Sequence, residues 1–334
     1  MADVARDAGV SVASVSNYLN KRPYMSADMA RRVAASIERL GYQVNSSART
    51  LRSGRTGLIK LMIPDLRQPY FSELAEDVLD RARAHGYGVI VESTTNSRER
   101  ELDGIRAMGT NMADGLILSP LLMRSDDVAV LDGDYPLVML GERLFGVDAP
   151  HVIIGNRSGA ADATAHLLAA GATRIMVVGA ALEERGETSS GLLRTRGHLE
   201  ALRAHGVASD LDLLVGTEGW GSRDGALAVE RALNRGLRFD AVLALNDALA
   251  WGVLRGLREH GVDVPGDVRV VGFDDVSESS YMSPSLTTVD PNRPEVARLA
   301  VESIVRQIEA GGRAPAMRVE AGHALRTRES SPAS

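Results

Sequence analysis

Three residues near the N-terminus, Ala5, Gly9 and Val15, have the spacing of a helix-turn-helix motif, whose chemistry is the recognition of base edges in DNA. A small side chain is needed where the two helices cross, Gly9 permits a left-handed backbone in the turn, and Val15 fills the core between the helices. Ser11 is placed to cap the second helix, which we expect over 11–19. The exposed N-terminal residues of that helix could then reach a major groove.

The same spacing also occurs by chance in other small helical domains, so the elements around it matter. The motif lies at the N-terminus of the chain, and a third helix is predicted after Ser26, which is a candidate cap. Its apolar residues recur at helical spacing. They are Met29, Val33, Ile37 and Leu40.

The charge distribution favours DNA binding as well. Residues 1–57 contain nine Lys and Arg against four Asp and Glu, a net charge of +5, whereas the rest of the chain contains 29 against 40, a net charge of −11. A basic head on an acidic body suits a module that contacts phosphates while the body stays off the DNA.

Composition sets further limits on the class of protein. The 334 residues are enough for a small head and one large or two medium domains. The absence of cysteine excludes disulfides, thiolate metal sites and thiol catalysis. We find no signal-peptide pattern and no apolar run near the roughly 20 residues of a membrane span, and we expect a cytoplasmic protein with no membrane partner.

From residue 57 onward, apolar runs alternate with amphipathic stretches. Buried strands are predicted over 58–63, 88–92, 115–118, 137–140, 174–178, 241–244 and 268–273. Helices are predicted over 70–85, 98–110, 158–170, 193–205, 222–234 and 247–260. This alternation predicts parallel sheets wound right-handedly, in two successive sets that form two lobes with a ligand cleft between them.

The sequence offers no credible catalytic set. Its seven histidines are scattered without metal-ligand spacing, and there is no nucleophile elbow, phosphate-binding loop or dinucleotide fingerprint. Asp274 and Asp275 are adjacent after a strand, so their side chains should point in different directions. We therefore expect neither an enzyme nor a bound metal or cofactor.

Taken together, motifs along nearly the whole chain resemble the LacI/GalR family of bacterial transcription regulators. They are the stretches 2–20, 41–45 (GYQVN), 48–56 (ARTLRSGRT), 63–66 (IPDL), 69–71 (PYF), 114–117 (DGLI), 271–275 (VGFDD) and 284–289 (PSLTTV). The resemblance implies a homodimer whose paired heads bind a near-palindromic operator. It also implies a body of doubly wound parallel sheets like that of periplasmic sugar-binding proteins.

The expected domains follow from this resemblance. They are a helix-turn-helix domain over 1–44, a hinge helix and linker over 45–57, and an effector-binding and dimerisation domain over 58–334. Lobe one would comprise about 58–154 and 290–318, and lobe two about 155–288 and 319–330. Three crossovers would lie near 154–156, 288–291 and 318–320.

The resemblance places Val12 and Ala13 at the positions that face base edges, where small apolar side chains can contact a thymine methyl. Asn17 stands where many members have arginine, and asparagine can pair with adenine. Other polar residues resemble phosphate contacts, although helix capping would explain some of them equally well. These are Ser11, Ser14, Asn20 and Ser26.

Residues 45–53 resemble a hinge helix that enters the minor groove, with Asn45 and Arg49 among its DNA contacts. Leu51 matches a leucine that wedges between base pairs and kinks the operator. Covering the body is the alternative role for Leu51, but its neighbours are too polar for a buried segment. Val44 stands where a proline commonly introduces the hinge. The chain also begins almost at helix one, so the true start could lie upstream.

The effector site implied by the resemblance combines apolar surfaces with polar groups for hydroxyls. Arg194 would be its arginine. Asp247 and Asp275 are better read as helix-cap or hinge residues, whereas Arg143 fits a structural ion pair and a ligand contact equally well. Gly155 and Arg293 depart from residues common in the family, so effector identity does not carry over. The aromatic candidates are Tyr70, Phe71 and Trp220, and the hydroxyl acceptors are Asn246 and Asp274.

The sequence thus predicts a DNA-binding transcriptional regulator, a repressor of carbohydrate genes controlled by a sugar or polyol. Two alternatives remain open at this point. One is a regulator responding to a purine-like metabolite, and the other is a solute-binding protein of sugar uptake, which would leave residues 1–57 without a purpose.

Overall fold

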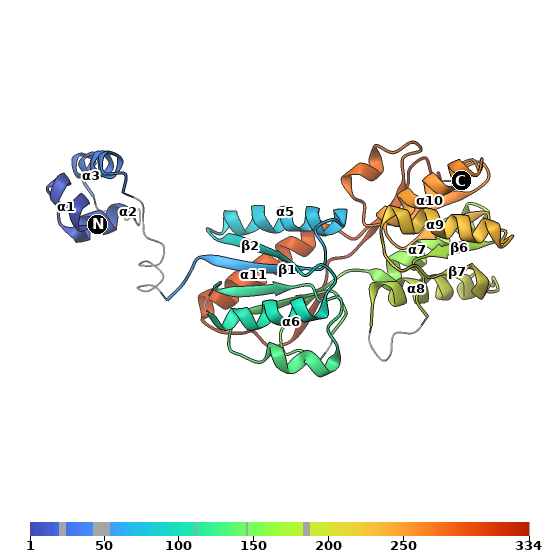
Figure 1. Ribbon diagram of the computed structural model, residues 1–334, viewed down its shortest axis with the longest axis horizontal. Helices are drawn as coiled ribbons and strands as arrows, with labels where there is room; N and C mark the ends of the chain where they lie inside the picture. The colour runs from blue at the N-terminus through green and yellow to red at the C-terminus, as the bar shows by residue number, and fades with distance from the viewer. Residues whose placement is uncertain (20–24, 43–53, 111, 145, 183–187, 334) are drawn as a thin grey trace. The chain divides into compact units, whose positions relative to one another are not determined.

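The computed structural model describes residues 1–19, 25–42, 54–110, 112–144, 146–182 and 188–333. They divide into two compact units, Met1–Thr56 and Gly57–Ser334. We describe the two units separately as the head and the body (Figure 1).

The head consists of α1 (Ala2–Ala8), α2 (Val12–Leu19) and α3 (Ala27–Arg39). Gly9 has a φ of 62°, in the left-handed region that the turn requires. Ala5 and Val15 are buried in the core of this domain, as predicted, together with Val33. Ser11 precedes α2 and caps it, so the second helix begins one residue later than expected. The helix-turn-helix prediction is therefore confirmed.

The last of the apolar residues at the predicted helical spacing, Leu40, lies just beyond the third helix. Leu40 is 47% exposed because α3 ends at Arg39, and Leu40 is the C-terminal cap. Ser26 caps the helix as predicted, since its side chain accepts a hydrogen bond from the backbone N–H of Met29.

The first sheet of the body has the strand order β11-β5-β4-β3-β1-β2, and all its strand pairs are parallel. Its strands are β1 (Leu58–Ile63), β2 (Gly88–Ser93), β3 (Gly115–Leu118), β4 (Leu137–Leu140), β5 (Pro150–Ile153) and β11 (Met317–Glu320). Helices α5 (Pro69–Ala84) and α11 (Arg293–Ala310) pack on one face, and α6 (Arg98–Arg106) packs on the other (Figure 1).

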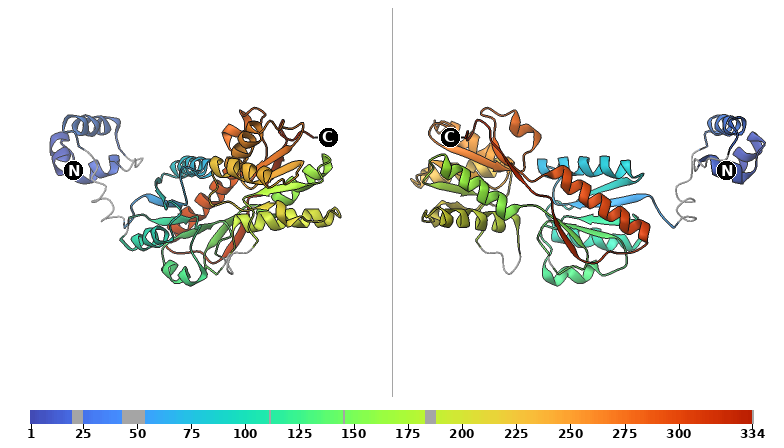
Figure 2. Two further views of the ribbon diagram at one scale, coloured as in Figure 1. Left: turned by 45° about the vertical axis from the view of Figure 1, so that its right-hand side comes forward. Right: turned by 180° about the vertical axis from the view of Figure 1, so that it is seen from behind.

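The second sheet has the strand order β12-β10-β9-β8-β6-β7. Its strands are β6 (Ile175–Val178), β7 (Leu214–Val215), β8 (Ala241–Ala244), β9 (Arg269–Phe273), β10 (Thr287–Asp290) and β12 (Ala324–Arg326). Helices α9 (Ser222–Asn234) and α10 (Asp247–Glu259) cover one face, whereas α7 (Asn156–Ala169) and α8 (Ser190–Ala204) cover the other (Figure 2).

The two-sheet α/β body is confirmed, with three corrections. Twelve strands form within the described residues, more than the seven predicted. The second sheet is not wholly parallel, because β12 pairs antiparallel with β10. The strands next to two of the expected crossovers extend past the approximate lobe bounds of 288 and 318, because β10 continues to Asp290 and β11 to Glu320. Residues 289–290 thus belong to the second sheet and 319–320 to the first.

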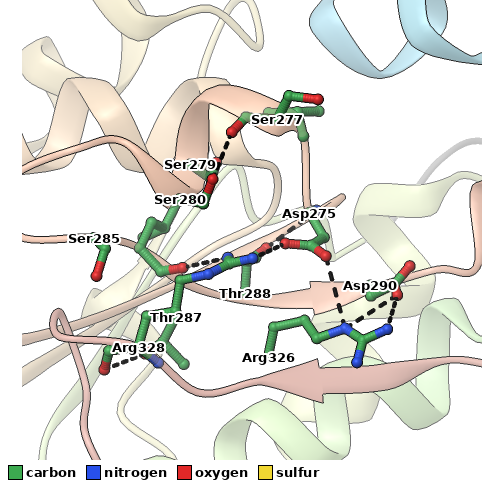
Figure 3. Close-up of polar contacts among 12 residues, drawn as sticks. Asp275, Ser277, Ser279, Ser280, Ser285, Thr287, Thr288, Asp290, Arg326 and Arg328 are labelled. Atoms are coloured by element: carbon green, nitrogen blue, oxygen red, sulfur yellow. Dashed lines mark hydrogen bonds and ion pairs between the residues drawn. The ribbon is translucent and has the colours of Figure 1, made fainter.

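Polar residues hold the edge of the second sheet together where β10 meets β12 (Figure 3). Asp275 accepts a hydrogen bond from Arg328 at 2.6 Å, and Arg326 forms an ion pair with Asp290 at 2.7 Å. Asp275 has a φ of 48°. Its carboxylate is therefore committed to the structure at the crossover, in keeping with the structural role expected for it.

The C-terminal segment completes this edge. Ser330 is fully buried, its hydroxyl donates to the Val270 carbonyl at 2.7 Å, and it accepts from the backbone N–H of Thr287 at 2.8 Å. His166 contacts Ser331 at 2.9 Å. Among the described residues, no helix is both long enough and apolar enough to cross a membrane.

Candidate functional sites: the recognition helix and a buried polar cluster

The predicted base-reading side chains of α2 lie on the surface of the head. Val12 is 48% exposed, and Ala13 and Asn17 are also exposed, whereas Val15 on the same helix is fully buried. One face of α2 therefore packs into the head and the other is available to a partner.

Two of the three hydroxyls predicted to contact phosphate, those of Ser11 and Ser26, serve as helix caps in the structure. Ser11 Oγ accepts from the Ser14 backbone N–H at 3.1 Å and lies 2.9 Å from Ser14 Oγ. Ser26 caps α3 and is exposed. These contacts settle the capping role, and the exposure of Ser11 and Ser26 leaves them accessible. Four predicted DNA contacts lie outside the described residues, namely Asn20, Asn45, Arg49 and Leu51.

Ion pairs link the helices of the head. Asp7 on α1 accepts hydrogen bonds from Arg39 and from Ser36 of α3, and Ser36 is 2.6 Å away. The Arg39 contact, followed by the Ser36 hydrogen bond, lowers the pKa of Asp7. This network fixes α3 against α1 and so holds the core against which α2 packs.

In the body, Arg194 of α8 is the centre of a buried cluster and is only 4% exposed. Its Nε donates to Asn156 Oδ1 at 2.7 Å, and its Nη1 donates to the Leu245 carbonyl. Nη1 also lies 3.6 Å from Asp274 Oδ1. Arg194 thus joins α7, the end of β8 and the end of β9, and the predicted pairing of Arg194 with Asp274 in one site is observed.

Aromatic rings surround this guanidinium. The Arg194 Cζ lies 3.5 Å from the Phe273 ring centroid and 5.9 Å from that of Trp220. Tyr70 and Phe71, at the start of α5, form an edge-to-face pair with centroids 5.3 Å apart. Burial, and then the negative charge of Asp274, raise the pKa of Tyr70. Tyr70, in α5 of the first lobe, is therefore near enough to this cluster to be influenced by the charge of Asp274.

Asn246 caps α10 and also contacts the first lobe, since its Nδ2 donates to Gln68 Oε1 at 3.4 Å. Its Oδ1 accepts from the Leu249 backbone N–H at 2.7 Å, while its Nδ2 donates to the Trp220 carbonyl at 3.1 Å. Gln68, from the first lobe, donates to the same carbonyl at 3.3 Å. Asn246 was expected to accept ligand hydroxyls, but in this structure its oxygen is used as a helix cap.

Two carboxyl groups of the cluster are poorly compensated. Burial raises the pKa of Asp274 to about 8, against the lowering influence of Arg194. Burial also raises the pKa of Glu142 to about 7, although Asn156 donates a hydrogen bond to it at 2.7 Å. Both groups can accept hydrogen bonds, and each becomes a donor when it is protonated.

Arg293, at the start of α11, is occupied by acids. Its Nε donates to Asp77 at 2.7 Å and its Nη1 donates to Glu73. Glu73 also accepts the backbone N–H of Ser277 at 2.9 Å. Since α5 carries Glu73 and the second lobe carries Ser277, this carboxylate bridges the lobes.

Sequence reasoning missed Glu142, Phe273 and Gln68 as members of the cluster. Glu142 follows β4 by two residues, and side chains after parallel strands gather at one edge of a sheet. Asn246 and Asp274 were named from the family resemblance, and the position of Glu142 after a strand is a signal that could have added it. For Gln68, which precedes α5, no such signal exists.

Gly155 differs from the residue that is common in the family at this position, and the difference has a steric explanation. A Cβ atom at this position would lie 2.4 Å from His323 Nδ1 and 2.8 Å from Ser158 Oγ. His323 also contacts Asp162 at 2.9 Å. An aspartate at position 155, which is frequent in the family, would require His323 to move. In this chain His323 occupies the space that such a side chain would need.

A helix-turn-helix head joined to a two-sheet body defines a class of bacterial DNA-binding regulators, and comparisons with known proteins agree. Residues 1–45 match the model for bacterial regulatory proteins of the lacI family, and residues 164–331 match that for a periplasmic binding protein-like domain. The ribose operon repressor of Halalkalibacterium halodurans is 33% identical over 92% of this chain and 89% of its own length.

Solved structures are similar as well. A LacI-family regulator from Sanguibacter keddieii is 43% identical, with a TM-score of 0.76, over 83% of this chain and 99% of that one. A structure described as a complex of the regulator CelR with cellobiose is 27% identical, with a TM-score of 0.72, over 98% of both chains. The chain belongs to the LacI family and is a DNA-binding transcriptional regulator.

Proposed function

We propose that this protein is a homodimeric repressor of carbohydrate-utilisation genes whose operator affinity is controlled by a sugar or polyol effector. The proposal rests on one observation. Tyr70 of the first lobe and Trp220 and Asp274 of the second lobe lie near Arg194. Rings provide flat surfaces for the C–H face of a sugar, and the charged groups provide hydrogen-bond partners for hydroxyls.

In this proposal the head, 1–44, reads DNA and residues 45–57 form the hinge. Val12 and Ala13 contact thymine methyl groups, and Asn17 pairs with adenine. Leu51 wedges into the minor groove. Phosphate contacts come from polar and basic residues, namely Ser11, Ser14, Asn20, Ser26, Asn45 and Arg49. The names of similar proteins, which include an operon repressor and a regulator bound to cellobiose, support repression and a carbohydrate effector.

The proposal requires ligand and DNA binding to be linked. A ligand that changes lobe closure changes operator affinity, and the operator must change ligand affinity by the same factor. Two side chains of the first lobe, Gln68 and Glu73, contact the second lobe. A ligand that binds between the lobes would change these contacts.

The test begins with binding sites selected from random duplex DNA by the full-length protein. We expect a near-palindromic site, affinity that falls steeply with salt, and no binding by a chain lacking residues 1–56. A sugar, polyol and nucleobase panel is then titrated calorimetrically with and without the selected DNA. We expect a sugar or polyol to bind with an affinity that the DNA alters.

Asp274→Asn and Asp134→Asn form a matched pair for this test, because Asp134 is an exposed loop residue. The first variant should still bind operator and lose the ligand response, whereas the second should behave as the parent does. Three results would contradict the proposal. The truncated body could bind DNA as tightly as the full chain, the ligand affinity could be the same with and without operator, or only a nucleobase could change operator affinity.

A further inference from the structure

The chain crosses between the two lobes three times, after β5, after β10 and after β11 (Figure 2). The third crossover contacts both of the others. The backbone N–H of Ala321 donates to the Ile153 carbonyl at 3.0 Å, and the side-chain amide of Asn292 donates to the Ala321 carbonyl at 2.9 Å. These bonds join the three segments at the place where any movement between the lobes must bend the chain.

His323 extends the contact between the third crossover and the first. Its ring occupies the space beside Gly155, since a Cβ atom at that position would lie 2.4 Å from Nδ1 and 3.1 Å from Cε1. The His323 side chain is only 15% exposed. It therefore closes the space next to the residue that connects the first crossover to α7.

Two side chains of α7 orient this ring. The Asp162 carboxylate lies 2.9 Å from Nε2, and since a carboxylate only accepts hydrogen bonds, Nε2 carries the proton. Nδ1 lies 3.4 Å from the Ser158 hydroxyl, which can donate to it. Asp162 is 65% exposed, so this contact adds little to the overall stability. Its consequence is that the ring cannot turn away from Gly155 without losing a hydrogen bond.

Gly155 is important because of the residue that follows it. Asn156 donates to Glu142 of the first lobe at 2.7 Å and accepts from Arg194 of the second at 2.7 Å. Its backbone N–H also donates to the Ile154 carbonyl at 2.7 Å. A rotation of the backbone at Gly155 would therefore displace the side chain that joins the two halves of the polar cluster.

The backbone conformation of Gly155 does not itself require glycine. Its φ is −70° and its ψ is 58°, close to the values of an inverse γ-turn, which other residues also adopt. The position requires the absence of a side chain, because His323 fills the space. A glycine has the greatest backbone freedom of any residue, so a crossover that contains one would bend easily if nothing restrained it. Here the neighbouring ring is the restraint.

We propose that His323 is a positioning residue that limits the movement between the lobes by filling the space beside Gly155. Without the ring, Gly155 would reach more backbone conformations, and the lobes would sample a wider range of separations. The effect rests on the proposed function only where DNA is concerned, because a ligand between the lobes would act on the operator through this movement. If His323 only fills a gap in the packing, its loss lowers stability and leaves the movement unchanged.

The movement of the lobes can be measured directly, because the chain contains no cysteine. Glu99→Cys on α6 and Arg203→Cys on α8 introduce one exposed attachment site in each lobe. The full-length protein carries a spin label at each cysteine and is mixed with an excess of unlabelled chain. Double electron–electron resonance then gives the distribution of distances between the two lobes of one chain, and neither a ligand nor DNA is needed.

His323→Ala in the labelled protein should widen this distribution. His85→Ala is the same change at an exposed residue that follows α5, and it should leave the distribution unchanged. A distribution of equal width in His323→Ala and in the parent overturns the inference.

A rescue separates a limit on movement from simple packing. In the parent, Gly155→Ala places a methyl group against the His323 ring and should lower Tm by about 5 °C. The Ser158 hydroxyl, 2.8 Å from the added Cβ, can rotate away.

In His323→Ala, the substitution Gly155→Ala should lower Tm by about 1 °C or less, because the two changes are coupled. It should also narrow the distance distribution again, since alanine has fewer backbone conformations than glycine. A double variant whose distribution stays as wide as that of His323→Ala contradicts the role given to His323.

The distance measurement and the ligand panel fail in different ways. A wider distribution in His323→Ala, together with no sugar or polyol bound by the parent, supports the limit on movement and contradicts the proposed effector. An unchanged width in a protein that binds a sugar with operator-dependent affinity contradicts the role of His323 and leaves the proposed function in place.

Discussion

Asp274 combines a backbone conformation and a burial that aspartates rarely show together. Its φ is 127°, a region that glycine usually occupies, and its side chain is nearly buried beside Arg194. Such strain persists only where the surrounding structure fixes it, and it is often found at functional sites. The backbone N–H of Asp274 donates to the Val289 carbonyl at 2.8 Å, which helps to hold the conformation.

The raised pKa of Asp274 predicts a pH dependence of stability. Folded protein holds a proton on this carboxyl up to a pKa of about 8, whereas the unfolded chain releases it near its ordinary value of 3.8. Between these values the folded state binds more protons, so the free energy of unfolding falls as pH rises, and the loss is complete above about 8. Asp274→Asn removes this loss.

Thermal unfolding between about pH 5 and pH 9 measures the effect as the difference in Tm between the parent and Asp274→Asn. The parent should lose stability relative to the variant as pH rises. Glu142 and Asp247, whose pKa values are also raised, remain in both proteins, as does His198, whose lowered pKa of about 4 acts in the opposite direction. A Tm difference that is the same at every pH would contradict the assignment.

At the residue scale, the family resemblance named several residues that the structure brings together. Asp274 and Asn246 follow strands, and the structure places both beside the cluster around Arg194. Position alone could not show that the Asn246 oxygen is used by the Leu249 N–H, since this depends on where α10 begins. Nor could it show that Phe273 stacks on Arg194.

At the element scale, strands with continuous apolar runs were predicted well, whereas short strands such as β7 and the polar strand β10 were missed. Thr287 and Thr288 of β10 are fully buried, because their hydroxyls bond to the Arg328 carbonyl and to Asp247, about forty residues away in the chain. No local pattern reveals such partners. In contrast α11, which was also missed, has an ordinary apolar repeat with Pro294 in its first turn, and the sequence was sufficient to predict it.

Helix α3 offers a test of the head at this scale. Ser26→Ala removes the side chain that accepts the Met29 N–H, and should destabilise the helix by about 1 kcal/mol. Faster hydrogen exchange of the first amides of α3 in the full-length protein would show this. Ser26→Asp should restore protection, because aspartate also caps helices. Unchanged exchange in Ser26→Ala would mean that packing alone fixes the start of α3.

At the scale of the whole body, the second sheet depends on the last residues of the described chain. Removing everything after Thr327 eliminates the Ser330 bonds to Val270 and Thr287 and the Arg328 bond to Asp275. At about 1 kcal/mol for each of these three hydrogen bonds, the free energy of unfolding should fall by at least about 3 kcal/mol.

Chemical denaturation of the full and shortened chains checks this prediction. Removal of residues 332–334 is the matched control, because Pro332 and Ala333 are exposed, and it should have little effect. Equal loss from both truncations would show that the buried serines do not stabilise the sheet edge.

The interleaved order of the sheets also has a consequence for synthesis. Strands β1 to β5 leave the ribosome first, but α11, which covers them with Ala297, Val301 and Ile304, follows only after β10 of the other sheet. Domains tend to fold as they emerge, yet the face of the first sheet that α5 and α11 share is covered only by α5 until about residue 310 has been made. A nascent chain of this protein therefore passes through a stage in which it is prone to aggregate, and no contiguous fragment can supply one lobe alone.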